Sequence, residues 1–340
     1  MTDKKTRVAF NGFGRTGRQA FKAIYENHPN LEVVGIGIRN MNSHEVMATL
    51  LAHDSTYGTF PGAVKSDGRN LIVNEQKIAF AAAPTPSRLP WRDLGVDIVI
   101  ECTGVFTQGS DAGQHIEAGA KKVIITSPAK NEDVTIVLGV NQDDYLPERH
   151  HIISNSSCTT NCLATTAKVL QDSFGIDAGL MMTCHAYTST QQLLDKTDKD
   201  ARRSRSAPTN IVPSTSGAAK ELGRVLPQLA GKFNGLAMRV PTPTVSIVEF
   251  TALLQKSATS NEINDAFRHA ACNGMKGILA VSEKPLVSTD FRGDPHSAII
   301  DALLTQSLGK MIKVSAWYDN EWGYSCRVAD LASFVASKGL

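Results

Sequence analysis

Apolar residues in the first half of the chain come in short runs that alternate with helical patterns. Runs typical of strands cover Arg7–Phe10, Leu31–Ile38, Asp97–Glu101 and Lys122–Thr126, whereas Arg15–Glu26 has a helical composition. Strands that alternate with helices are typical of a parallel sheet with helices on both faces. The pattern therefore predicts a doubly wound α/β domain.

The second half has longer strand-like runs, separated by Pro and Gly, at 179–184, 235–240, 245–254 and 311–318. They predict a mixed or antiparallel sheet in an α+β domain. A last helical pattern covers Tyr324–Ser337. Because 340 residues are long for one core, we expect two domains. The first would comprise 1–157, completed by a C-terminal helix in 321–340, and the second 158–320.

Composition narrows the class of protein. The formal net charge is +2, and no basic run of the kind that binds nucleic acid is present. No apolar run has transmembrane length. A strand pattern starts within the first ten residues, and nothing there resembles a signal peptide. The six cysteines have neither zinc-ligand spacing nor the density of a disulfide scaffold. We therefore expect a cytoplasmic protein without a metal site, a membrane or a nucleic-acid partner.

A glycine turn follows the first strand and opens the first helix. Gly12, Gly14 and Gly17 fit the pattern G-x-G-x-x-G, and a second strand follows the helix. Such glycines let the backbone approach a pyrophosphate, which then lies at the helix N-terminus. A Gly-rich turn without a ligand is the plain alternative. The context favours a Rossmann-type dinucleotide-binding domain.

The end of the second strand selects between the two nicotinamide cofactors. An acid there binds the ribose 2′-hydroxyl of NAD and repels a 2′-phosphate. The chain has Ile38 and then Arg39 instead, and Arg39 is a cation within reach of a 2′-phosphate. Arg39 is equally compatible with a solvated loop. The residues favour NADP.

The stretch Ser154–Cys162 surrounds a cysteine with hydroxyl and amide side chains. Apolar residues at helical spacing follow from Leu163 to Phe174, and Gly175 is a typical C-terminal stop. Cys158 is therefore expected at a helix N-terminus, where a thiol ionises more easily and becomes a nucleophile. The alternative is a polar helix cap beside a structural cysteine.

His185 follows Cys158 by 27 residues, at the end of a strand-like run. A cysteine at a helix start and a histidine at a strand end can face each other, and the histidine then acts as a general base. A lone histidine is more often structural. Hydroxyl groups and arginines downstream suit phosphate oxygens, although Asp195–Arg205 also fits a solvated loop.

The chain closely resembles the phosphorylating glyceraldehyde-3-phosphate dehydrogenase family over essentially its whole length. The matching motifs are Asn11–Arg18, Ser154–Cys162, His185–Thr188, Ala201–Arg205, Ser216–Lys220, Ala237–Pro243 and Trp317–Ser325. The resemblance implies that Cys158 adds to glyceraldehyde 3-phosphate as a thiohemiacetal. His185 would raise the thiolate population of Cys158, and it would take the hydroxyl proton as hydride leaves for the nicotinamide. Inorganic phosphate would convert the thioester to 1,3-bisphosphoglycerate, and the reaction is reversible.

The resemblance also implies binding residues. One phosphate subsite would use Thr188, Arg203 and Arg239, and the other Ser157, Thr159, Ser216 and Gly217. Arg15 and Thr16 would lie at the pyrophosphate, and Thr103, Thr126 and Asn320 near the nicotinamide. A homotetramer is also implied.

Three departures from the family pattern bear on the cofactor, and one of them is Pro84 in place of the family's arginine near the adenine. NAD-specific members have an acid at Ile38 and Leu-Pro at Lys196-Thr197, on a loop that reaches the adenosine ribose of a neighbouring subunit. Here Arg39, Lys196 and Thr197 could converge on a 2′-phosphate, so we expect NADP, with NAD also possible. An erythrose-4-phosphate dehydrogenase and a non-catalytic RNA-binding or scaffold relative are the alternatives. The retained Thr188 and Ser216 favour glyceraldehyde 3-phosphate, and the presence of Cys158 and His185 argues against a non-catalytic relative.

Overall fold

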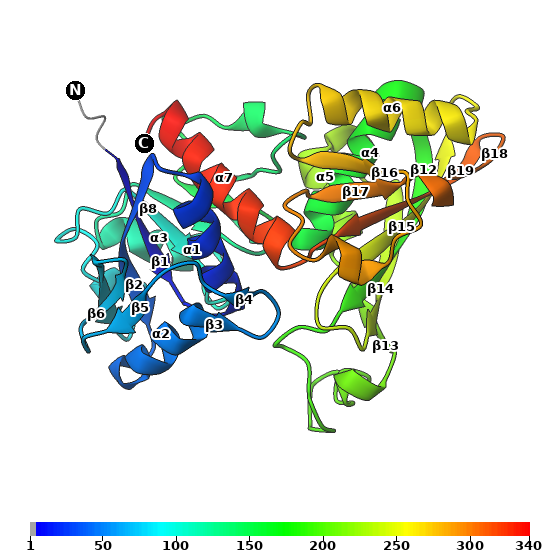
Figure 1. Cartoon of the computed structure of the whole chain (residues 1–340). Coiled ribbons are helices and arrows are strands. Elements are labelled where there is room, and N and C mark those ends of the chain that lie inside the picture. The colour runs from blue at the N-terminus through cyan, green and yellow to red at the C-terminus, as the bar shows by residue number, and fades with distance from the viewer. Residues whose placement is uncertain (1–4) are drawn as a thin grey trace. The chain divides into compact units, whose positions relative to one another are not determined.

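The computed structural model describes residues 5–340, which form two compact units (Figure 1). The first unit contains the described residues through Ile136, then Asp143–Ser156 and Ser325–Leu340. The second contains Val137–Gln142 and Ser157–Tyr324. The bounds 1–157 and 321–340 predicted for the first domain include Ser157 and 321–324, which lie in the second unit, as do residues 137–142. Residues 137–142 join the second unit because Val137 and Val140 pack in its apolar core with Leu163.

The first unit is built on a nine-stranded sheet with the order β10-β11-β9-β8-β1-β2-β7-β6-β5. Every pair from β10 to β7 is parallel, as the alternating pattern predicts. The strand bounds are β1 Thr6–Asn11, β2 Leu31–Ile38, β5 Val64–Ser66, β6 Asn70–Val73, β7 Gln76–Ala82, β8 Ile98–Glu101, β9 Lys122–Ile125, β10 Val134–Thr135 and β11 Ile152–Ser154. A separate small ribbon pairs β3 His53–Asp54 with β4 Gly58–Thr59.

The edge formed by β5, β6 and β7 is antiparallel, which the sequence analysis did not predict. Its tight hairpin turns through Asn74 and Glu75, both in the left-handed region with φ of 45° and 73°. Two consecutive left-handed residues make a type I′ turn, for which the usual sequence signal is Asn-Gly. Because Glu75 stands where glycine is usual, the turn gives no clear signal in the sequence.

Four helices pack in the first unit: α1 Arg15–Asn27, α2 His44–Ala52, α3 Gly109–Glu117 and most of α7 Trp322–Lys338. The C-terminal helix α7 is anchored by polar contacts near the end of α1. His28 Nε2 lies 3.0 Å from Asp330 Oδ1, and Asn30 donates to Ser333 Oγ at 3.0 Å. None of the helices within residues 5–340 is both long enough and apolar enough to cross a membrane.

The second unit is built on a mixed eight-stranded sheet with the order β13-β14-β12-β15-β19-β17-β16, and β18 pairs with β19. The pairs β12–β14 and β16–β17 are parallel and the others antiparallel. The strand bounds are β12 Ile176–Ala186, β13 Val212–Thr215, β14 Phe233–Val240, β15 Ser246–Leu254, β16 Leu279–Ser282, β17 Ala298–Asp301, β18 Gln306–Leu308 and β19 Met311–Tyr318. The predicted mixed sheet is confirmed.

The helices of the second unit are α4 Cys158–Phe174, α5 Ala218–Val225 and α6 Ser260–Cys272. Alternate residues of the central strands, such as Val248 and Phe250, share one apolar core with Leu163 and Phe267 of these helices. Burial of this face removes a large apolar area from water and fixes the position of α4 on the sheet. Cys158 is the first residue of α4, so the core also determines where its thiol lies.

Candidate active site

Helix α4 begins where the sequence predicts. The hydroxyl of Ser157 accepts the N–H of Thr160 at 3.0 Å, which is the expected N-cap bond. At the other end Gly175 has a φ of 69°, and its N–H bonds to the carbonyl of Gln171. These two caps leave Cys158 in the first turn, beside backbone N–H groups that have no partner within the helix.

The structure brings the two predicted catalytic side chains together inside the second unit. His185 is the penultimate residue of β12, and its Nε2 lies 3.5 Å from the Sγ of Cys158. This is hydrogen-bond distance for sulfur, so a proton can pass between the thiol and the imidazole. His185 is 3 % exposed, and Cys158 is partly buried.

Arg239 completes the arrangement from the neighbouring strand. The parallel register of β12 and β14 places Arg239 directly opposite His185. Arg239 Nη1 lies 2.6 Å from His185 Nδ1 and donates to the carbonyl of Ala186 at 3.2 Å. His185 Nδ1 also lies 2.7 Å from that carbonyl. Since a guanidinium only donates and a carbonyl only accepts, Nδ1 can bond to one of them at a time.

Burial and Arg239 set the protonation of the pair. Burial lowers the pKa of His185 to about 3, and the positive charge of Arg239 adds to the effect, so the imidazole is neutral at ordinary pH. Burial also raises the pKa of Cys158, while Arg239 and the hydroxyl and N–H of Thr159 partly offset that rise. The sequence predicted an easily ionised thiol from the helix start. That expectation is wrong here, because desolvation is the larger effect.

Tyr318 supports the pair and was not predicted from the sequence. Its ring meets that of His185 edge to face at 5.9 Å between centroids. Its hydroxyl bonds to Thr159 Oγ1 at 3.0 Å and to Thr183 Oγ1 at 2.9 Å. Alternation along β19 places Tyr318 on the core face, and a buried tyrosine usually has a partner for its hydroxyl. The sequence pattern indicated only that this position ends a strand-like run at 311–318.

Besides Arg239, the predicted anion-binding residues occupy three places in the second unit. Thr188 and Arg203 are linked through Thr190, whose Oγ1 lies 3.1 Å from Thr188 Oγ1 and 3.3 Å from Arg203 Nη2. Ser157 is the N-cap of α4 and Thr159 lies in its first turn, while Ser216 and Gly217 directly precede α5. The hydroxyl of Ser216 accepts the N–H of Ala218 at 3.3 Å.

A short chain of hydrogen bonds orients Asn320. The N–H of Ala186 donates to Ser246 Oγ at 3.0 Å, and that hydroxyl donates to Asn320 Oδ1 at 2.9 Å. Because its oxygen is engaged, Asn320 would meet a ligand through its NH2 group. The backbone beside His185 and the side chain of Asn320 are thus held by one serine.

The glycine turn of the first unit has the shape of a phosphate cradle. Gly12 has a φ of +91°, and a Cβ there would lie 2.9 Å from the N of Thr103. A Cβ on Gly17 would lie 2.5 Å from the carbonyl oxygen of Gly12, whereas Gly14 faces open space. The turn leads directly into the N-terminus of α1, which attracts anions. These features fit the pyrophosphate of a dinucleotide.

Comparison with known proteins identifies the family of the chain. A family model described as the glyceraldehyde 3-phosphate dehydrogenase NAD binding domain matches residues 6–109, and the model of its C-terminal domain matches 157–320. The chain is 54 % identical over 335 residues to glyceraldehyde-3-phosphate dehydrogenase of Geobacillus stearothermophilus, covering 98 % of this chain and 99 % of the relative. The chain belongs to the glyceraldehyde-3-phosphate dehydrogenase family. Two further relatives are named glyceraldehyde-3-phosphate dehydrogenase 1. The one from Bacillus subtilis is 52 % identical, covering 98 % of this chain and 99 % of the relative. The one from Streptomyces avermitilis is 51 % identical, covering 97 % of this chain and 98 % of the relative.

The remaining predicted cofactor residues of this family member divide between the units. Those in the first unit follow the carboxyl ends of its parallel strands, where a doubly wound sheet binds ligands: Arg15 and Thr16 after β1, Arg39 after β2, Thr103 after β8 and Thr126 after β9. Lys196, Thr197 and Asn320 belong to the second unit, and the first two are exposed.

Arg15 is held by a buried carboxylate. Its Nη1 lies 2.6 Å from Asp54 Oδ2, and Asp54 is 7 % exposed. Burial alone would raise the pKa of Asp54, but the N–H groups of Thr56 and Tyr57, with Arg15, hold that pKa below its ordinary value. The guanidinium also lies over the Tyr57 ring, 5.8 Å from its centroid. Arg15 is therefore oriented beside the glycine turn.

Replacing Arg239 by Met in a His185→Asn background tests the electrostatics of the thiol, because the imidazole then no longer changes with Arg239. Loss of the charge that lowers the pKa of Cys158 should raise that pKa. The rate of alkylation by iodoacetamide, followed against pH, should therefore fall at neutral pH while the limiting alkaline rate is retained. Arg203→Met is the matched control, because its guanidinium bonds to Thr190. An unchanged pH profile for Arg239→Met would contradict this account.

Proposed function

We propose that this family member is a phosphorylating glyceraldehyde-3-phosphate dehydrogenase. The observation that carries the proposal is the 3.5 Å contact between Cys158 Sγ and His185 Nε2. A thiol next to a neutral imidazole is the arrangement required for a covalent nucleophile with its own general base. The curated relatives bear the name of this activity.

The residues act in a defined order in this proposal. Cys158 adds to the aldehyde carbon of glyceraldehyde 3-phosphate, and its sulfur becomes part of a thiohemiacetal. The nicotinamide cofactor supplies the acceptor for the hydride. His185 Nε2 takes the hydroxyl proton, which leaves a thioester on Cys158. Inorganic phosphate then attacks the thioester carbon, releases the thiolate and forms the acyl phosphate 1,3-bisphosphoglycerate.

Arg239 connects substrate binding to this base. While Arg239 donates to His185 Nδ1, the proton of the neutral ring is at Nε2, which then cannot accept another. An anionic substrate that draws Arg239 away frees Nδ1 to donate to the carbonyl of Ala186, which lies 2.7 Å from it. Nε2 then carries a lone pair that faces Cys158. In this proposal, binding of the substrate phosphate itself prepares His185 as a base.

Two sets of donors serve the two anions. The cluster of Thr188, Thr190 and Arg203, with Arg239, offers hydroxyl groups and two guanidinium forks for one phosphate. The first turn of α4 with Ser157 and Thr159 offers a second place, with Ser216 and Gly217 contributing by family resemblance. Fixed donors of this kind orient the reacting groups and stabilise a developing oxyanion.

The proposed cofactor is NADP(H), with NAD(H) also used. Support comes from the end of β2, where Ile38 is 6 % exposed and apolar, and Arg39 is exposed. The side-chain oxygen of Asn40 is engaged by the N–H of Asn42 at 2.9 Å, and Arg39 carries the positive charge beside it. Lys196 and Thr197 would add to the 2′-phosphate site from a neighbouring subunit.

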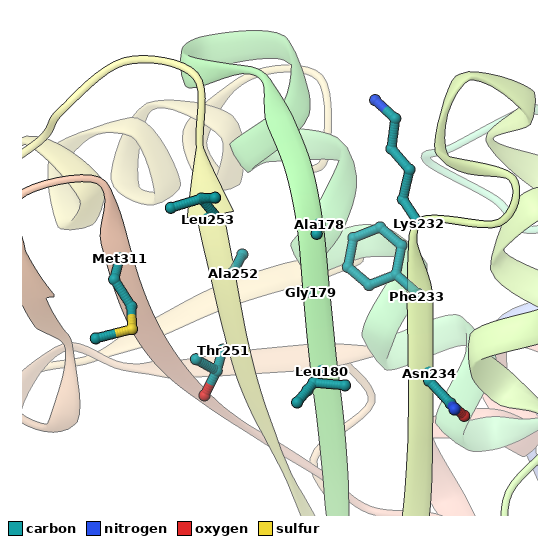
Figure 2. A pocket seen from close by; sticks show the side chains of 10 residues that line it. All are labelled: Ala178, Gly179, Leu180, Lys232, Phe233, Asn234, Thr251, Ala252, Leu253 and Met311. Carbon is teal, nitrogen blue, oxygen red and sulfur yellow. The ribbon is translucent and has the colours of Figure 1, made fainter.

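The proposed assembly is a homotetramer. The mixed sheet buries one face under α4, α5 and α6, and its other face carries exposed apolar side chains. Figure 2 shows Leu180, Leu253 and Met311 on three neighbouring strands of that second face. They are 65 %, 45 % and 50 % exposed. A sheet face of this composition is typical of a contact between two copies of a chain.

The first prediction from this proposed function concerns inorganic phosphate and the catalytic pair. Reduction of the cofactor by glyceraldehyde 3-phosphate should require inorganic phosphate or arsenate for turnover. Cys158→Ser should abolish turnover, and His185→Asn should lower kcat by about 10²–10⁴-fold, the usual contribution of a general base. Steady-state turnover that is equally fast without phosphate or arsenate would overturn the phosphorylating assignment.

The second prediction concerns the cofactor. The wild-type kcat/KM should be higher with NADPH than with NADH. Ile38→Asp should reverse that order, because a carboxylate repels the 2′-phosphate and binds the 2′-hydroxyl. Arg39→Ala should weaken NADPH and leave NADH nearly unchanged, which controls for any loss of stability at the buried Ile38. A wild-type enzyme at least about tenfold better with NADH would contradict the assignment.

The third prediction concerns assembly. The double variant Leu180→Glu, Leu253→Glu should have a smaller mass than the wild-type tetramer in light scattering, because two carboxylates would be buried in the contact. Val46→Glu, at a position 58 % exposed on α2, should keep the tetramer mass. A tetramer mass for the double variant would rule out this face.

A further inference from the structure

A buried carboxylate in the first unit has no part in the chemistry described above. Glu101 is the last residue of β8 and is 1 % exposed. It lies at the carboxyl end of a strand next to β1, which leads into the glycine turn. A carboxylate removed from water is costly unless its oxygens are hydrogen-bonded, so its partners matter.

Four donors converge on this carboxylate. Oε1 accepts the N–H of Thr103 at 2.7 Å and also the hydroxyl of Thr103. Oε2 accepts Asn11 Nδ2 at 2.6 Å and faces His115 Nε2 at 3.0 Å. Each oxygen thus accepts two hydrogen bonds, which is the ordinary capacity of a carboxylate. Glu101 therefore ties together the end of β1, the loop after β8 and helix α3.

Trp91 determines the direction of the bond from His115. The indole Nε1 lies 2.9 Å from His115 Nδ1, and an indole N–H can only donate. Nδ1 must therefore accept, which places the ring proton on Nε2, facing Glu101. Trp91 and His115 are both fully buried. The hydrogen bonds can therefore be donated in one direction only, from Trp91 to His115 and from His115 to Glu101.

The partners of Glu101 form the walls of the phosphate cradle. Gly12 follows Asn11, and a Cβ on Gly12 would lie 2.9 Å from the N of Thr103. Asn11 in turn fills the space beside Gly37, where a Cβ would lie 2.5 Å from Asn11 Oδ1. A small displacement of Asn11 or Thr103 would therefore close or open the cradle around Gly12.

We propose that Glu101 is a positioning residue for the cofactor, which holds the glycine turn and the Thr103 loop in their binding shape. Trp91 orients His115, whose Nε2–H donates to the Glu101 carboxylate and keeps it in place. The inference rests on the cofactor-binding role proposed for this unit. It also changes the part played by Thr103, whose hydroxyl donates to Glu101 and accepts the N–H of Val105 at 3.1 Å. Thr103 would shape the cofactor site without donating a hydrogen bond to the ligand.

The test is Glu101→Gln. This substitution keeps the size of the side chain but replaces one carboxylate oxygen by an NH2 group, which then faces hydrogen-bond donors and cannot accept from them. An unsatisfied donor at a buried site costs enough to weaken binding about tenfold or more. The dissociation constants of NADP(H) and NAD(H) should rise by that factor in equilibrium fluorescence titrations, and the cofactor KM should rise more than kcat falls. The alkylation rate of Cys158 without cofactor should stay unchanged, because Cys158 belongs to the other unit.

A second variant tests the direction of the chain. In Trp91→Phe the donor to His115 Nδ1 is absent, so the ring proton can move to Nδ1 and Nε2 can accept. The double variant Trp91→Phe, Glu101→Gln should therefore bind the cofactor more tightly than Glu101→Gln alone. The assigned direction would be overturned if the double variant bound the cofactor as weakly as Glu101→Gln alone, or more weakly.

A matched control separates positioning from general stability. Val73→Ala shortens a fully buried side chain of the same unit on β6, at the far side of the sheet from β8. It should lower the melting temperature without raising the cofactor dissociation constant. The inference fails if Glu101→Gln binds within about twofold of wild type, or if Val73→Ala with an equal loss of melting temperature binds as weakly. Either result would leave the proposed activity intact, whereas a wild-type protein that binds neither cofactor would refute the activity itself.

Discussion

The parallel pairing of β12 with β14 is the constraint on which the candidate active site depends. It places His185 opposite Arg239 in register, and the packing of α4 on the same sheet brings Cys158 within 3.5 Å of that imidazole. A shift of one residue in this register would turn His185 to the other face of the sheet. The apolar core beneath α4 thus holds the chemistry in place, because the helix cannot slide without exposing Leu163 and its neighbours.

Both units use buried polar groups to fix loops at the ends of strands. In the second unit Tyr318 bridges Thr159 and Thr183, and Ser246 joins the backbone of Ala186 to Asn320. In the first unit the carboxylate of Glu101 does the same. Each buried polar atom would be costly without a partner, so each network permits one arrangement of the loops around it. The loops at the ends of these strands are thereby held in one conformation by their buried partners.

Long periodic elements were well predicted from the sequence, and irregular ones were not. The bounds of β2, α4 and β19 agree with the hydrophobic pattern, since each is a long element with mostly buried residues. The hairpin at Asn74 and Glu75 was missed because its left-handed turn lacks the usual glycine. Residues 137–142 were placed with the wrong unit, because only packing shows that Val137 and Val140 reach the core of the second.

By itself the sequence determined the two-domain α/β plan, the glycine turn, and Cys158 and His185 as candidates, because periodicity and capping are local properties of the chain. Tertiary structure decided the rest of the site. It brought Arg239 to the imidazole, placed Tyr318 under it, and reversed the expected shift in the pKa of Cys158. Those properties depend on desolvation and on contacts between residues far apart in the chain. The donors around Glu101 come from three separate segments for the same reason, and no local pattern in the sequence could have revealed them.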